Sequence, residues 1–345
     1  MKISAAISFP FEPSQATRRA RDLEAAGIDM IWVPEAYTFD AVSLLGYLAA
    51  HTERVELATG ILPLFSRTPS LIAMSAAGLD SVSGGRFVLG LGTSGPQVIE
   101  GWHGVPFDRP LTRTRETIDI CRILWRREQV VYDGEAYRLP LPPDEGTGLG
   151  KPLRLINRPL REEIPIYLAS IGPKNVQLTA ELADGWLPAF FHPDRAGDVF
   201  GPDLEIGGNR RDPSRAPLEV VAGGPLAICD SETAERIRDM ARPATALYVG
   251  GMGARSKNFY NDIFRRCGYE REAQEIQDLY LAGHKDEAAA AVPTGYLEAT
   301  ALVGDEGFVR ERVLAYKAAG VTRLHVDPMG DDWPGLIELV RSWVD

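Results

Sequence analysis

The amino-acid sequence predicts a single α/β domain over residues 1–345, folded as a (β/α)8 TIM barrel with insertions after its fourth and seventh strands. Short apolar runs alternate with longer amphipathic runs, and eight strand candidates are each followed by helical sequence. The strand candidates are almost continuously apolar, which is typical of a parallel sheet covered by helices. No Gly-x-Gly-x-x-Gly motif follows the first of them, so a closed barrel is favoured over an open dinucleotide-binding sheet.

The helices of the first half begin and end at residues typical of helix boundaries. Ser14 is predicted to cap the first helix, which ends before Gly27. Asp40 caps the second, and Thr68-Pro69 opens the third with proline at the first helical position. The predicted strands are Ile3–Phe9, Ile28–Val33, Val55–Ile61 and Phe87–Gly92, and the predicted helices are Ser14–Ala26, Asp40–His51, Thr68 to Gly84 and Thr112–Arg127.

The regular alternation breaks twice in the second half. Val130–Tyr137 is predicted as a hairpin around an Asp133-Gly134 turn, and a Pro/Gly-rich loop follows over residues 139–158. A long helical stretch from Ser231 to Ala291 forms the second insertion. The other strands are predicted at Ile164–Ser170, Gly185–Leu187, Leu218–Cys229 and Thr322–Val326, and the other helices at Pro173–Ala183, Glu306–Ala319 and Pro334–Val344.

The composition excludes several classes of function. A net charge of −11 argues against a nucleic-acid or membrane surface. No apolar run reaches the roughly 18 residues of a membrane span, and Lys2–Phe9 is predicted as a strand rather than part of a signal peptide. We therefore expect a cytoplasmic protein. Cys121, Cys229 and Cys267 show neither metal-ligand nor disulfide spacing, so we expect buried thiols and no metal site.

In a barrel of this class the loops after the strands build the functional site. These segments are rich in glycine, hydroxyl and aromatic residues and carry few charges, which favours a large planar heterocycle held by backbone and apolar walls. The alternative, that the small residues only make tight turns, stays open for each segment taken alone. The segments are Phe9, 34–36, 60–62, 92–95, 169–174, 186–192, 223–224 and 327–329.

Gly172-Pro173-Lys174 is the strongest candidate for binding an anion. The motif lies between a predicted strand and a predicted helix, so the free N–H groups of the first helical turn and the helix dipole favour a phosphate there. Lys174 adds a positive charge. Many helices begin in this way without binding a ligand, so the prediction of an anion site depends on the position of the motif at the barrel mouth.

Glu35 directly follows a buried strand, where a carboxylate needs a role or a partner. It is predicted either to transfer a proton near the substrate or to form a salt bridge with an arginine. Among the histidines, His103 and His192 are the two that could face the mouth. His325, on the last strand, is expected to be a packed core residue.

These segments, in this order along nearly the whole chain, identify a family resemblance. The chain resembles the coenzyme F420-dependent branch of the bacterial-luciferase-like superfamily, which includes methylenetetrahydromethanopterin reductase. The resemblance also extends to residues 250–253 and 258–260. The segments that carry it are Ile31–Glu35, Thr59–Pro63, Leu89–Gly95, Ile171–Asn175 and Ala183–Trp186.

The resemblance implies the barrel fold, a dimer, and a non-prolyl cis peptide at Gly60–Ile61 that presses against the deazaflavin ring. It places the cofactor phosphate at Ser170–Lys174 and an acidic residue, Glu35, beside the ring. Relatives that oxidise alcohols or sugar phosphates have a histidine where this chain has Ala36, and the sugar-phosphate type has a glutamate where it has Pro96. The expected cofactor-binding residues are Gly60, Ile61, Gly92, Thr93, Ser94, Gly95, Ala169, Ser170, Gly172, Pro173 and Lys174.

The resemblance therefore implies an enzyme that moves a hydride between C5 of coenzyme F420 and a small organic substrate. The departures at Ala36 and Pro96 favour an unsaturated or imine-like substrate over an alcohol or sugar phosphate. Two alternatives remain, an FMN-dependent monooxygenase and a non-catalytic F420-binding barrel. The expected partners are the small-molecule substrate and a second copy of the chain, with no nucleic acid and no membrane.

Overall fold

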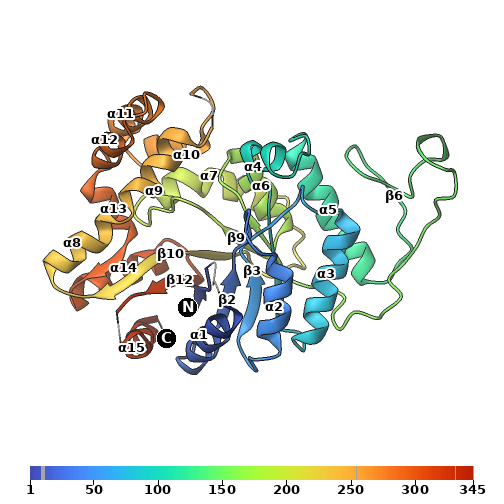
Figure 1. Ribbon diagram of the computed structural model, residues 1–345, viewed down its shortest axis with the longest axis horizontal. Helices are drawn as coiled ribbons and strands as arrows, with labels where there is room; N and C mark the ends of the chain where they lie inside the picture. The colour runs from blue at the N-terminus through green and yellow to red at the C-terminus, as the bar shows by residue number, and fades with distance from the viewer. Residues whose placement is uncertain (9–11, 254, 331, 345) are drawn as a thin grey trace.

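Eight parallel strands close into a barrel in the computed structural model, which describes residues 1–8, 12–253, 255–330 and 332–344. Each strand pairs with its neighbours in chain order, and the last pairs with the first, so the predicted (β/α)8 fold is confirmed (Figure 1). Phe9, predicted at the end of the first strand, lies outside the described residues. The strands are β1 (Lys2–Ala6), β2 (Met30–Val33), β3 (Glu56–Thr59), β5 (Phe87–Gly92), β8 (Ile166–Ala169), β9 (Gly185–Leu187), β10 (Glu219–Ile228) and β12 (Arg323–Pro328).

Helices surround the strands, and their capping residues explain where several of them begin. The Asp40 carboxylate accepts the Ser43 N–H, and the Thr68 hydroxyl accepts the Leu71 N–H, as expected for N-caps. The first helix instead begins at Pro13 without a side-chain cap, so the prediction of a Ser14 cap is wrong; proline at the first position needs no N–H partner. The helices are α1 (Pro13–Ala25), α2 (Ala41–Ala49), α3 (Pro69–Val82), α5 (Pro110–Trp125), α6 (Pro173–Leu182), α7 (Ala196–Gly208), α14 (Glu306–Ala318) and α15 (Trp333–Val344).

The first insertion follows α5 and carries the predicted hairpin, β6 (Tyr132–Asp133) and β7 (Arg138–Leu139). The hairpin is present, but its turn is not centred on Asp133-Gly134 as predicted, because Asp133 pairs with Arg138 and residues 134–137 form the loop. The buried Glu116 carboxylate explains the wider loop. It accepts the N–H groups of residues 135, 136 and 137 at 2.8–3.3 Å.

The second insertion follows β10 and is not one continuous helical stretch. Prolines and glycines divide it, notably Pro243, Gly268, Gly283 and Pro293. It has a small hydrophobic core of its own, separate from the core between the barrel strands and the outer helices. Its elements are α8 (Ser231–Asp239), α9 (Arg242–Ala246), a π-helical turn (Leu247–Gly251), α10 (Phe259–Arg266), α11 (Glu270–Leu281), α12 (Lys285–Ala290), α13 (Thr294–Thr300) and β11 (Leu302–Gly304), which pairs with β10.

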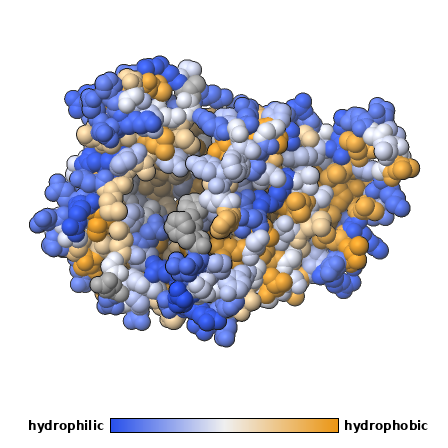
Figure 2. Space-filling model, in the orientation of Figure 1, coloured by the Kyte–Doolittle hydropathy of each residue, from blue (hydrophilic) through white to orange (hydrophobic). Residues whose placement is uncertain are grey.

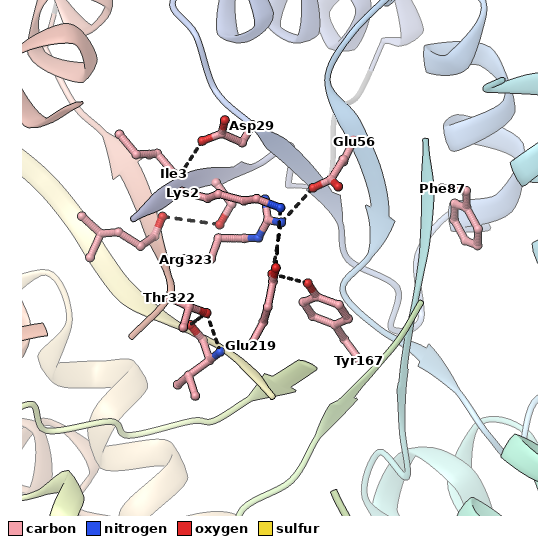
Figure 3. Close-up of polar contacts among 12 residues, drawn as sticks. Lys2, Ile3, Asp29, Glu56, Phe87, Tyr167, Glu219, Thr322 and Arg323 are labelled. Carbon is pink, nitrogen blue, oxygen red and sulfur yellow. Dashed lines mark hydrogen bonds and ion pairs between the residues drawn. The ribbon is translucent and has the colours of Figure 1, made fainter. Parts of the chain in front are cut away.

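Charged residues fill the barrel interior at the amino ends of the strands (Figure 3). Arg323 is 1% exposed, and its Nη2 lies 2.8 Å from Glu56 and 3.2 Å from Glu219. The Tyr167 hydroxyl donates to the Glu219 carboxylate. Lys2 approaches Glu219 at 3.5 Å from the more exposed side. This cluster closes the end of the barrel opposite the predicted site, where polar residues contribute to stability rather than to chemistry.

The described helices include none that is both long enough and apolar enough to cross a membrane.

Candidate active site

Very small residues occupy inward positions at the carboxyl ends of three strands, whereas Trp32 and Leu187 stand inward at the ends of β2 and β9. Side chains alternate along a strand, so Gly60, Ala169 and Gly223 point inward like Ala58, Tyr167 and Val221, two residues before each of them. Although they lie at a barrel wall, these three residues are partly exposed to solvent. Figure 2 shows the molecule hollowed between the helices of the second insertion and the strands. The mouth of the barrel is therefore open, as the predicted site requires.

The Gly60–Ile61 peptide is cis, which confirms the geometry implied by the family resemblance. The Ile61 side chain extends over Gly92, where an added Cβ would lie 3.1 Å from Ile61 Cδ1 and 3.4 Å from the Ala169 Cβ. Glycine at position 92 thus makes room for Ile61. Three of the residues predicted to contact the cofactor, Ile61, Gly92 and Ala169, meet at one side of the mouth.

The residues after β5 continue along the mouth into a short helix, α4 (Pro96–Gly101). Ser94 has a positive φ of 56° and is exposed, and Gly95 occupies the N-cap position without a side-chain bond. The Thr93 hydroxyl donates to the Ser94 carbonyl at 3.2 Å. The structure therefore brings Thr93, Ser94 and Gly95 to the mouth as a turn with free polar groups.

The predicted phosphate loop joins β8 to α6. Gly172 occupies the N-cap of α6, Pro173 is its first residue, and Lys174 is exposed. The ring of Phe259 lies over this loop, since an added Cβ at Gly172 would be 3.2 Å from Phe259 Cε1. The α10 end of the second insertion thus completes the loop, and sequence reasoning left Phe259 out of the site although it stands within the resembling segment 258–260.

Ser170 differs from the other residues of this loop because its side chain is used within the fold. Its hydroxyl is buried and lies 2.7 Å from the Thr179 hydroxyl of α6. The Trp186 indole N–H donates to the Ser170 carbonyl at 2.9 Å. Ser170 therefore fixes α6 and β9 around the loop rather than presenting its hydroxyl to the mouth.

Glu35 forms the salt bridge that the sequence left open as one of its two roles. Its side chain is 7% exposed, and its two oxygens lie 2.5 and 2.9 Å from the guanidinium of Arg67. The same carboxylate accepts the Ala41 N–H at 2.9 Å, and Arg67 also pairs with Asp40. Burial opposes the charge of Arg67, but its bonds to Glu35 and Asp40 outweigh this effect and raise the pKa of Arg67.

The histidines lie differently from the prediction. His192 is buried beneath the second insertion, with Tyr269 and Tyr296 about it, and burial lowers its pKa. His103 is half-buried after α4, and its Nε2 has no hydrogen-bond partner in the described structure. His325 is not a packed core residue: its side chain is 25% exposed and its Nε2 lies 3.6 Å from Asp327 Oδ1.

An apolar pocket of about 1040 Å³ lies beside the loop that follows β2. Its lining includes Pro34, Tyr37, Phe39 and Leu44, with few polar groups. The ring of Tyr37 faces that of Trp102, with 6.2 Å between their centroids. Apolar walls with a few polar groups are the usual lining of sites for small organic ligands. Within the described residues no cluster of histidine, cysteine and acidic side chains could hold a metal ion.

Comparisons with known sequences agree with this geometry. The family model described as luciferase-like monooxygenase matches residues 2–323. A protein of Mycobacterium tuberculosis, provisionally named a coenzyme F420-dependent oxidoreductase, is 46% identical over 308 residues, which cover 88% of this chain and 87% of that protein. The 5,10-methylenetetrahydromethanopterin reductase of Archaeoglobus fulgidus is 29% identical over 325 residues, covering 92% of this chain and 90% of the reductase.

Solved structures share the fold at lower identity. The coenzyme F420-dependent tetrahydromethanopterin reductase of Methanopyrus kandleri superposes with a TM-score of 0.77 at 23% identity, covering 98% of this chain and 96% of the reductase. The oxygenating constituent of 3,6-diketocamphane monooxygenase of Pseudomonas putida, in complex with FMN, gives 0.64 at 19% identity, covering 99% and 96%. At these identities the similarity shows the barrel fold and not the chemistry.

Proposed function

Because the chain belongs to the luciferase-like monooxygenase family, we propose that it is an F420-dependent oxidoreductase that moves a hydride between C5 of the deazaflavin and a small organic substrate. The observation that carries the proposal is the hollow mouth, lined by Gly60, Gly92, Ala169 and Gly223, with the cis Gly60–Ile61 peptide at its side. The 46% identical relative named for F420 supports the same cofactor.

The residues at the mouth fit a flat ring with an anionic tail. Side chains larger than a methyl group are missing from positions 60, 169 and 223, so a planar ring would meet backbone there, with the ring of Trp32 beside Gly60. Ile61 and the 92–95 turn would hold its edges, and the first turn of α6 with Lys174 would hold a phosphate. The bound deazaflavin would supply or accept the hydride, while the protein positions it against the substrate and excludes water.

The apolar pocket lined by Pro34 and Tyr37 supports an uncharged organic substrate, and the residues at positions 36 and 96 favour one with an unsaturated or imine-like bond. Ala36 offers no histidine for oxidising an alcohol, and Pro96 offers no carboxylate. We propose that Glu35 exchanges a proton at this site. Since Arg67 binds both oxygens of Glu35, that exchange requires Arg67 to give up one hydrogen bond.

Fluorescence titration tests the cofactor assignment. We expect the protein to bind F420 more tightly than FMN, and Lys174→Ala to raise the Kd for F420 about tenfold, the effect of losing one charge-assisted hydrogen bond. Lys151→Ala, which removes an exposed charge from the first insertion, serves as the control and should leave the Kd unchanged. Equal or tighter binding of FMN would contradict the proposal in favour of an FMN-dependent monooxygenase. Binding of F420 without turnover of any hydride acceptor would favour a non-catalytic binding protein.

We also propose that the chain forms a homodimer through α2 and α3. Tyr47, Leu71 and Met74 are exposed large apolar side chains on these helices, which a partner copy could cover. Gly46 and Gly78 have open space above them, so a partner helix could approach closely. Sedimentation analysis should give twice the mass of 37.8 kDa, and Met74→Glu should shift it toward one copy. A mass of one copy for the natural chain would contradict this proposal.

The three free cysteines fit a reducing compartment, which supports a cytoplasmic location.

A further inference from the structure

Three polar residues occupy alternate positions on the last barrel strand. Leu324 and Val326 of β12 pack outward against the helices, in the core between strands and helices. Arg323, His325 and Asp327 therefore point inward. Arg323 belongs to the closed amino end of the barrel, whereas Asp327 lies toward the mouth. His325 stands between them, inside the barrel and below the candidate site.

Small residues leave His325 open to the mouth. Its register partners are Ser4 on β1 and Gly223 on β10, and the next inward residue on β1 is Ala6. Larger inward side chains stand further round the barrel, where Met30 pairs in register with Ser4, Trp32 with Ala6 and Leu187 with Ala169. The imidazole is 25% exposed, and its ring takes part in no hydrogen bond of the described structure. It is thus a free titratable group facing the mouth of the barrel, where we place the deazaflavin ring.

Asp327 is the charged group closest to His325, with its Oδ1 3.6 Å from Nε2. Burial lowers the pKa of His325, and the Asp327 carboxylate opposes that shift. Arg19, which stacks on Trp333, lies near Asp327 on the outer side. Arg323 lies two residues along the strand, but Glu56 and Glu219 engage its charge. Asp327 is therefore placed to favour the protonated form of the imidazole.

A hydride-transfer reaction of the proposed kind needs two groups that donate or accept protons. In the reducing direction a bound, reduced deazaflavin would supply a hydride to one atom of the C=N or C=C bond of the substrate. The other atom of that bond, which keeps the former π electron pair, needs a proton, and a second proton would leave the deazaflavin. Glu35 is one such group, but Arg67 engages both of its oxygens.

We propose that His325, with the Asp327 carboxylate beside it, is a second catalytic residue that gives the substrate its proton in reduction and takes it back in oxidation. Each turnover then oxidises the deazaflavin by two electrons and reduces the substrate by two, and solvent returns the proton to His325. This inference rests on the proposed function.

A direct test follows the imidazole signals of the whole protein by NMR as pH is varied, with His325→Gln to assign the signal of His325. Asp327→Asn should lower the pKa of His325 below its value in the natural protein, because the carboxylate that favours the charged imidazole is gone. Addition of oxidised F420 should shift the His325 signal and leave that of the exposed His284 in place. If F420 binds and the His325 signal does not move, the proposal is wrong; if F420 does not bind, the proposed function fails first.

Turnover provides the second test, with reduced F420 and the probes 2-cyclohexen-1-one and 1-pyrroline. His325→Gln should lower kcat by roughly 10²–10⁴-fold, as for other general acid–base groups, with the Kd for F420 within about twofold of the natural protein. His284→Gln is the matched control and should leave kcat unchanged. Reduction should slow as pH rises through the pKa of His325, and His325→Gln should lack that dependence. Equal kcat for His325→Gln and the natural protein would overturn the proposal.

Discussion

Arg323→Met is expected to lower the free energy of unfolding by roughly 3 kcal/mol, the low end of the cost of removing one partner from a buried ion pair. Arg323 is 1% exposed, and its loss leaves Glu56 without this cation and Glu219 with only the half-exposed Lys2 (Figure 3). The cost falls at the low end because both carboxylates are about one-third exposed and water can reach them. Urea unfolding followed by circular dichroism measures the change.

Two further variants decide whether the charge is the cause. Lys2→Met removes a half-exposed cation that lies beside Glu219. It should lower the free energy of unfolding by less than about 1 kcal/mol. Adding Glu56→Gln and Glu219→Gln to Arg323→Met should recover much of the loss, because no unpaired charge then remains. The Tyr167 hydroxyl and Arg323 hold the pKa of Glu219 low against the effect of burial. The difference in free energy of unfolding between the natural protein and Arg323→Met should therefore decrease as pH falls through the lowered pKa of Glu219. If Arg323→Met lowers the free energy of unfolding by less than about 1 kcal/mol at pH 7, the charged cluster is not needed for stability.

Glu35→Gln should lower turnover by roughly 10²–10⁴-fold if Glu35 exchanges a proton, since glutamine keeps the size and hydrogen bonding but not the acid–base chemistry. The F420 affinity should change little. Steady-state turnover with reduced F420 and the thermal midpoint are measured on one preparation, so that activity is counted per folded molecule.

The control for Glu35→Gln is Asp40→Asn, which removes the other ion pair of Arg67 and leaves Glu35 unchanged. Asparagine is as good an N-cap as aspartate, so α2 should keep its cap. If Asp40→Asn lowers turnover as much as Glu35→Gln does, the effect arises from the position of Arg67 and not from a proton on Glu35. Loss of thermal stability in Glu35→Gln with normal turnover would leave the salt bridge as the only role.

The barrel could be predicted because its strands carry strong local signals. Continuous apolar runs such as Phe87–Gly92 and the glycine that ends the helix before β2 are visible in the sequence alone. The α7 helix was missed, since glycines and Pro202 lower its intrinsic helix propensity. Its packing on α6 stabilises it instead: a Cβ at Gly207 would lie 2.1 Å from the Gln177 carbonyl oxygen.

The site was predicted less completely than the fold, because its pairings join distant residues. Glu35 was found from its place after a strand, but nothing local to it identifies Arg67, which lies 32 residues further along the chain. His325 was interpreted as a core residue because the direction of one side chain depends on strand register. Its signal was present, however, as arginine, histidine and aspartate at alternate positions 323, 325 and 327 of a buried strand.

The separate core of the second insertion gives it a local stability that differs from that of the barrel. Such a unit can open and close while the barrel stays folded, in a sub-global unfolding equilibrium. Phe259 covers Gly172 from α10, which contributes Phe264 to this core and Ile263 to the barrel core, so an opening that releases α10 also uncovers the loop at the start of α6. An anion held there would favour the closed form, and ligand affinity and insertion stability are thus thermodynamically linked. Core substitutions around Phe264 or Ile276 consequently act on the affinity of a site that neither residue touches.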